Sequence, residues 1–140
     1  MTRKIFKQGD VYLVEFKPER VGSYGKRPVV CLHDSATIVY NHALVAPLTR
    51  LYNQSGEMKS RNDLTDIAIF KKHYPDGPIT KDSIIMVHQI RLVQHWELAE
   101  YLGRLHERDI QQIKYSLILL FRLDKLLSQT VKGWSEMAGE

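Results

Sequence analysis

The hydrophobic pattern of this 140-residue chain changes its period once, near residue 106. Before that point, apolar residues form short runs separated by turn-forming residues, as is typical of β-strands. After it they recur every three or four residues, as on one face of a helix: Ile110, Ile113, Leu117, Leu120 and Phe121. Several strands followed by one helix predict a small β-barrel capped by a helix, which is a mainly β fold with a C-terminal helix.

We expect residues 1–140 to form a single domain, because this length and an ordinary composition suit one hydrophobic core. In the first strand, Val11 and Leu13 share one face, while Tyr12, Val14 and Phe16 share the other. The expected elements are a strand over 11–16, a loop over 17–26, a strand from Pro28, a strand over 43–48 in which Pro47 marks an end, an edge or a bulge, a short apolar stretch over 67–70, the strongest strand signal over 83–93, a turn or short final strand over 101–105, a helix over about 107–128, and a tail over 129–140.

Cysteine and histidine usage indicates neither a disulfide nor a metal site. Cys31 is the only cysteine and lies in an apolar run, so we expect a buried, unreactive thiol. The six histidines show no ligand spacing, and we expect no metal and no cofactor. The chain also lacks a signal-like apolar core and a stretch long enough to span a membrane, which predicts a cytoplasmic protein without a membrane partner.

Positive charge is concentrated near the first loop. The net charge is +4 overall, and Lys17, Arg20, Lys26 and Arg27 stand against Glu19 alone in this segment. Such a cluster suits a polyanion, although a solvated loop has the same composition.

Five short motifs resemble, in their order and approximate spacing, the MazF/PemK toxin family. They are Gly9-Asp10-Val11-Tyr12, Gly25-Lys26-Arg27-Pro28-Val29-Val30, Pro47-Leu48-Thr49, Gln89-Ile90-Arg91-Leu92-Val93 and Leu102-Gly103-Arg104-Leu105, and the resemblance extends from about Gln8 to Phe121. It implies an SH3-like barrel, a homodimer, sequence-specific cleavage of single-stranded RNA, and an antitoxin partner whose acidic, flexible tail covers the RNA site.

The chemistry of such cleavage also indicates which residue types are needed. RNA supplies its own nucleophile, the 2′-OH, so a metal-independent nuclease must accept that proton, stabilise the phosphorane and protonate the leaving 5′-oxygen. Arginine suits the second task because its guanidinium donates two parallel hydrogen bonds to phosphate. By resemblance, Arg27 matches the family's catalytic arginine and Thr49 the threonine that supports the phosphate. The structural alternatives are a surface arginine in a local ion pair and a strand-end threonine.

His88 departs from the family pattern, in which an acidic residue commonly precedes the glutamine. An imidazole changes charge near neutral pH, so His88 is a candidate proton carrier; the alternative is a partly buried histidine that is hydrogen-bonded at a strand end. Tyr24 lies where some relatives have a carboxylate, which leaves the general base unassigned, and its ring could stack on an unpaired base. The candidate RNA-binding residues are Lys17, Arg20, Tyr24, Lys26, Gln89 and Arg91.

The sequence therefore favours an endoribonuclease whose catalytic candidates are Arg27, Thr49 and His88. Two alternatives stay open at this point: a non-catalytic toxin of the same fold that binds and inhibits a protein target such as gyrase, and an RNA-binding barrel that does not cleave. The retained Arg27 and Thr49 favour the enzyme, because a protein binder has no need of that pair.

Overall fold

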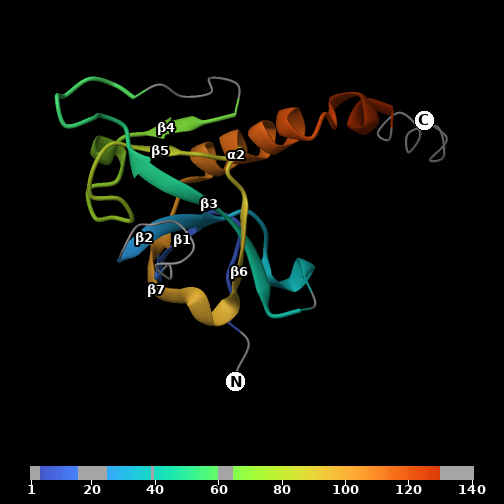
Figure 1. The fold of residues 1–140 in the computed structure, drawn as a ribbon. Coiled ribbons are helices and arrows are strands. Elements are labelled where there is room, and N and C mark those ends of the chain that lie inside the picture. Colours follow the sequence, from blue (N-terminus) through green and yellow to red (C-terminus); the bar gives the residue numbers. More distant parts are fainter. Residues whose placement is uncertain (1–3, 16–24, 39, 60–64, 130–140) are drawn as a thin grey trace.

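The computed structural model describes residues 4–15, 25–38, 40–59 and 65–129 (Figure 1). A strongly bent, seven-stranded antiparallel sheet carries one long helix that projects from its side. The elements are β1 (Asp10–Glu15), β2 (Lys26–Cys31), η1 (Ser35–Thr37), β3 (His42–Arg50), β4 (Ile67–Ile69), η2 (Lys71–His73), β5 (Ser83–Ile85), β6 (Arg91–Gln94), η3 (His95–Glu97), β7 (Leu98–Arg104) and α2 (Glu107–Leu120).

The sheet runs in the order β4-β5-β3-β2-β1-β7, and β6 pairs with β3 beside this path. Because the sheet is bent, side chains on both of its faces are buried. Val11 of β1 belongs to a core cluster that also contains Ile110 and Ile113 of α2, whereas Tyr12 and Val14 belong to a second cluster on the other face. The predicted alternation is therefore confirmed for Val11, Tyr12 and Val14, while Phe16 lies outside the described residues. The predicted fold class, a mainly β small barrel with a C-terminal helix, is also confirmed, although the ladders between the described strands do not close into a ring.

The central strand, β3, changes its partner at Pro47. Its first part pairs with β6 as far as Val45, and its last part pairs with β5 from Leu48 onward. Proline has no N–H to give to a ladder, so Pro47 fits the junction at which one partner ends and the next begins. Its carbonyl still accepts the Met86 N–H at 3.0 Å. Pro47 thus lies inside a nine-residue strand and not at its end. The strand accommodates the proline through a change of pairing partner, and not through the edge or bulge that was also considered.

Several predicted boundaries differ from the structure. The strong apolar signal over 83–93 is divided into β5 and β6, because the Gln89 N–H donates to the Met86 carbonyl at 2.9 Å and closes a turn between them. Strand β2 begins at Lys26, two residues before Pro28, and β7 is a seven-residue strand where a turn or a short strand was predicted. Hydrophobic pattern alone does not locate a turn closed by backbone hydrogen bonds.

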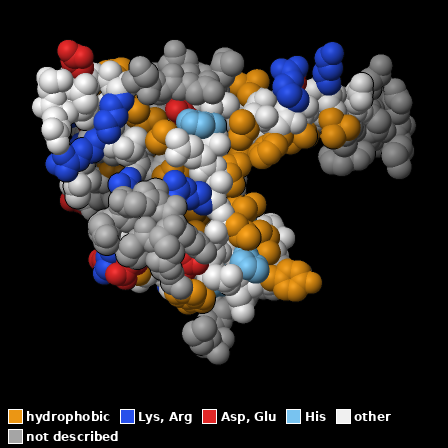
Figure 2. Space-filling model, in the orientation of Figure 1, with side chains coloured by type: hydrophobic (Ala, Val, Ile, Leu, Met, Phe, Trp, Pro, Cys, Tyr) orange, Lys and Arg blue, Asp and Glu red, His pale blue; other side chains and the backbone are white. Residues whose placement is uncertain are grey.

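The helix predicted over about 107–128 is interrupted. Helix α2 ends at Leu120, Arg122 has a φ of 54°, and residues 124–129 are helical again. A left-handed residue ends a right-handed helix, because the backbone leaves the hydrogen-bonding direction there. Beyond the buried residues of α2, apolar side chains on this arm are exposed, as Figure 2 shows where the arm leaves the body: Tyr115, Leu119, Phe121, Leu123, Leu126 and Leu127. None of the helices in the described part of the chain is long and apolar enough to cross a membrane.

The approach of α2 to the start of β1 requires a glycine. Gly9 has a φ of +95°, and a Cβ built on it would lie 2.4 Å from Cδ1 of Ile110. The Gly9 carbonyl accepts the Leu105 N–H at 3.0 Å, which ties the end of β7 to the same point. The Gly-Asp motif is therefore a packing site between the sheet and the helix.

Candidate functional site

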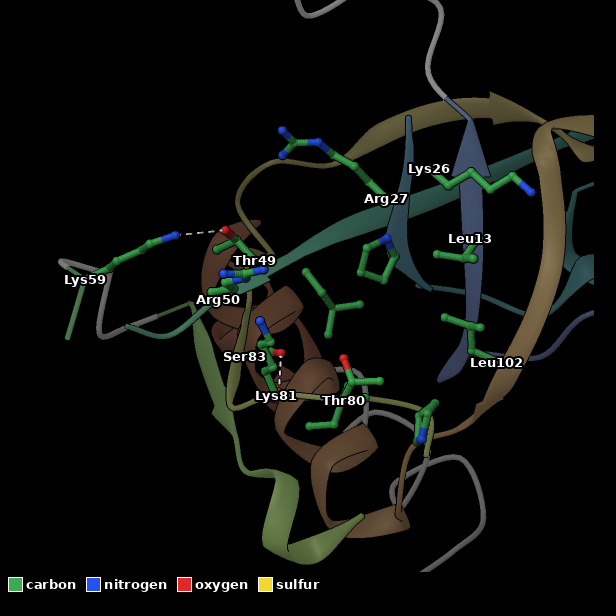
Figure 3. A pocket seen from close by; sticks show the side chains of 14 residues that line it. Leu13, Lys26, Arg27, Thr49, Arg50, Lys59, Thr80, Lys81, Ser83 and Leu102 are labelled. Atoms are coloured by element: carbon green, nitrogen blue, oxygen red, sulfur yellow. Dashed lines mark hydrogen bonds between the residues drawn. The ribbon is translucent and has the colours of Figure 1, made fainter. Parts of the chain in front are cut away.

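A hollow with a volume of about 610 Å³ opens where β2 and β3 meet the segment between η2 and β5 (Figure 3). Its lining is of two kinds. Apolar side chains come from Leu13, Pro28, Leu48, Pro78, Ile79 and Leu102, and polar or charged ones from Lys26, Arg27, Thr49, Arg50, Lys59, Thr80, Lys81 and Ser83. Figure 2 shows lysine and arginine side chains gathered around the end of β3.

Arg27 of β2 and Thr49 of β3 line the same hollow from neighbouring strands. Val29 of β2 pairs with Pro47 of β3 in an antiparallel ladder. The ladder ends at this pair: beyond it Thr49 pairs with Ile84 of β5, and Arg27 pairs with Val14 of β1. The Lys59 ammonium lies across the Thr49 side chain and donates to Oγ1 at 3.3 Å, as the dashed line in Figure 3 marks. Two strands and one loop thus supply three polar groups to one edge of the hollow.

The hollow is positively charged and its charges are not neutralised. Five of its lining residues are lysine or arginine, and none is aspartate or glutamate. Within the described part of the chain, none of these five cations forms a salt bridge, whereas Arg104, Arg108 and Arg122 elsewhere each lie near a carboxylate. A concave surface with uncompensated cations attracts anions over a longer range than a paired surface does.

His88 lies outside this lining, as do Gln89 and Arg91. All three belong to the segment that joins β5 to β6 or to the start of β6. Nδ1 of His88 is 2.6 Å from Oδ1 of Asp66, whose side chain is only 2% exposed. The segment begins at Met86, whose N–H donates to the carbonyl of Pro47. Pro47 is two residues from Thr49 on β3, which corresponds to about 7 Å along the strand.

The structure therefore gathers Lys26, Arg27 and Thr49 from the predicted set. Lys17, Arg20 and Tyr24 lie outside the described residues. Sequence reasoning missed Arg50, Lys59 and Lys81 in the hollow, and it missed Asp66 beside His88. Arg50 directly follows Thr49 and could have been included on that ground. The other three come from segments that only the fold brings near.

Cys31 is fully buried, as predicted, and burial together with the charge of Asp10 raises the pKa of its thiol to about 12. A neutral thiol is a poor nucleophile, so Cys31 is a core residue. Across residues 4–15, 25–38, 40–59 and 65–129, no three His, Cys, Asp or Glu side chains gather closely enough to hold a metal ion.

Comparison with known proteins places this arrangement in a family. A family model of PemK-like, MazF-like toxins of type II toxin–antitoxin systems matches residues 7–121. The fold is similar to an endoribonuclease in complex with its cognate antitoxin from Mycobacterial species, at 20% identity and a TM-score of 0.62, covering 84% of this chain and 96% of that one. It is also similar to MazE–MazF from Deinococcus radiodurans, at 15% identity and a TM-score of 0.62, covering 84% and 97% of the two chains. The Mycobacterium tuberculosis toxin MazF-mt6 has 13% identity and a TM-score of 0.59, with 81% and 96% covered. The chain belongs to the PemK-like, MazF-like family of toxins of type II toxin–antitoxin systems.

Proposed function

We propose that this chain is a sequence-specific, metal-independent endoribonuclease that cleaves single-stranded RNA, in the cytoplasm, by attack of the 2′-OH. The observation that carries the proposal is the hollow that joins Arg27 and Thr49 to further cations without any acidic side chain in its lining. Phosphate is the anion that RNA presents along its whole length, and guanidinium groups bind it with two parallel hydrogen bonds. The name of the mycobacterial structure, an endoribonuclease, points in the same direction.

The groups at the edge of the hollow suit a phosphorane. Arg27 is exposed and never loses its charge, so it can neutralise the additional negative charge of the transition state. Thr49 Oγ1 accepts a hydrogen bond from Lys59, which leaves the hydroxyl proton of Thr49 available to a phosphate oxygen. In this assignment Arg27 stabilises the reacting phosphorus centre, Thr49 holds a non-bridging oxygen, and Lys59 orients Thr49.

The apolar part of the lining favours single strands. Leu13 and Leu102 are half-buried and line the hollow together with the cations, which provides a surface for an unpaired base next to its own phosphates. Bases in a duplex are stacked and paired and do not present their faces in this way. Lys26, Gln89 and Arg91 are the described candidates for contacts on either side of the cleaved bond.

We propose an antitoxin partner with an acidic segment that covers the hollow. Uncompensated cations on a concave surface fit carboxylates as well as phosphates, so an acidic peptide would compete directly with RNA. The mycobacterial and Deinococcus structures named above are complexes with an antitoxin or with MazE.

We also propose a homodimer. The exposed apolar side chains along the arm of α2 and residues 124–129, including Leu119, Phe121 and Leu126, form the kind of surface that a second copy would bury. A dimer would bring two hollows into one assembly.

The test of the proposed function is cleavage of a long RNA by the purified chain in excess EDTA. We expect cleavage, products that end in a 2′,3′-cyclic phosphate or its opened form, and survival of DNA of the same sequence, which lacks the nucleophile. Cleavage that EDTA abolishes and magnesium restores would contradict the metal-independent mechanism. RNA that binds but stays intact would favour the non-catalytic alternatives.

A further inference from the structure

His88 and Asp66 form a hydrogen-bonded pair near the proposed site. Asp66 directly precedes β4, and His88 lies between β5 and β6, so 22 residues separate them in sequence. The Asp66 side chain is 2% exposed, whereas that of His88 is 34% exposed. The carboxylate therefore lies behind the ring, and the ring separates it from solvent.

This contact selects one tautomer of the imidazole. A carboxylate oxygen is an acceptor, so at 2.6 Å the Nδ1 atom of His88 must carry the proton. The neutral ring then has its lone pair on Nε2. Among the described residues, Nε2 of His88 has no hydrogen-bond partner. A partly exposed imidazole whose Nδ1 is held by a buried acid is oriented to accept a proton at Nε2.

Strand pairing places this pair next to the Arg27–Thr49 edge. Ile67 and Ile85 are partners in the ladder of β4 and β5, so Asp66 lies beside Met86. Met86 in turn donates to the carbonyl of Pro47, two residues from Thr49. His88 therefore lies four residues beyond Ile84, the ladder partner of Thr49, in the segment that leaves the hollow at the end of β5.

We propose that Asp66 is the positioning residue for His88, and that His88 Nε2 is the proton acceptor of the cleavage; the inference rests on the proposed function. As the 2′-oxygen forms its bond to phosphorus, its proton moves to Nε2. The bond between phosphorus and the 5′-oxygen breaks, and the leaving oxygen takes a proton from water. The imidazolium then loses its proton to solvent. Asp66 accepts the Nδ1 hydrogen bond throughout and stabilises the charged ring.

Two measurements test the role of Asp66. The first is the ¹⁵N spectrum of the histidine rings, with His88 assigned by comparison with His88→Gln; we expect the Nδ1–H tautomer in the wild type. The second is single-turnover cleavage of one short RNA by wild type, Asp66→Asn, His88→Gln and the double variant, each checked for folding by circular dichroism. We expect His88→Gln to lose about 10²–10⁴-fold, the usual contribution of a general base, and Asp66→Asn to lose about 10–10²-fold. In the His88→Gln background, Asp66→Asn should change the rate less than about 2-fold, because the two residues act as one unit.

Asp10→Asn is the matched control. Asp10 is also a buried acid, and it accepts from the Lys7 N–H and from Arg104 at a site outside the hollow. It should lower thermal stability without changing the single-turnover rate or the His88 spectrum. An Nε2–H tautomer in the wild type would overturn the inference, even where Asp66→Asn fails to fold. Rate losses that multiply in the double variant would overturn it while leaving the proposed function intact. A wild-type chain that leaves RNA uncut would overturn both.

Discussion

The charge of the hollow predicts how steeply RNA binding depends on salt. Each phosphate neutralised on a single strand releases about 0.7 of a counterion, so the logarithm of the binding constant falls by about 0.7 per contact for each tenfold rise in salt. The hollow holds five cations without acidic neighbours in its lining. If each meets one phosphate, the expected slope is about −3.5. Affinity should then fall about 10²-fold between 50 and 200 mM salt.

The assay is fluorescence anisotropy of a short labelled RNA whose 2′-hydroxyls are methylated, so that binding is measured without cleavage. Lys81→Ala should weaken binding at low salt and reduce the slope by about 0.7–1, because it removes one cation from the hollow. Lys114→Ala is the matched control: it removes an equal charge from an exposed position on α2 that does not line the hollow.

Two results would refute this reasoning. A wild-type slope shallower than about −1 would mean that the hollow does not contact several phosphates. An equal change of slope in Lys81→Ala and Lys114→Ala would mean that RNA responds to total charge and not to the hollow. Either result would mean that the cations of the hollow do not bind the phosphates of RNA, and the proposed function depends on that binding.

Three further predictions concern other parts of the molecule. Arg27→Ala should keep its circular dichroism spectrum and lose about 10²–10³-fold in single-turnover cleavage, and Arg27→Lys should restore little of the rate. Thr49→Ala should lose less, since a charged donor contributes more than a neutral one. A folded Arg27→Ala that cuts at the wild-type rate would remove Arg27 from the site. Light scattering at micromolar concentration should report about twice 16.3 kDa, and a monomer would contradict the dimer. Gly9→Ala should lower the free energy of unfolding, measured in urea, by about 2–5 kcal/mol, because the φ is left-handed and the new Cβ overlaps Ile110. Gly56→Ala has a similar φ but open space around it, so it should lower that free energy by only about 1–2 kcal/mol. Equal losses would contradict the packing argument.

Much of the fold follows from local pattern. The alternation of Val11 and Tyr12 and the helical recurrence of Ile110 and Ile113 are statements about which face of an element is apolar, and burial confirms them. The division of residues 83–93 into two strands depends on a turn closed by a backbone hydrogen bond between Gln89 and Met86. The spacing of apolar residues does not depend on such a bond, so the boundary between β5 and β6 could not be predicted from that spacing.

The candidate site was predictable only in part, for a geometric reason. Arg27 and Thr49 belong to motifs of the family, and strand register brings those motifs together. Lys59 and Lys81 lie in polar segments whose residues are ordinary surface types. Their position beside Thr49 and Ser83 depends on how two loops return to the sheet, which no pattern within either loop encodes.

The contact between His88 and Asp66 gives a physical reason for a histidine at position 88, where the resemblance to the family leads us to expect an acidic residue. A carboxylate at that position would face the buried carboxylate of Asp66, and two acids in contact cannot both ionise without a large energetic cost. An imidazole at position 88 removes the repulsion and makes the buried acid a hydrogen-bond acceptor. The negative charge then lies on the buried side chain of Asp66, and in the proposed mechanism the proton acceptor is a ring nitrogen. A buried acid at position 66 therefore favours a histidine over a second acid at position 88.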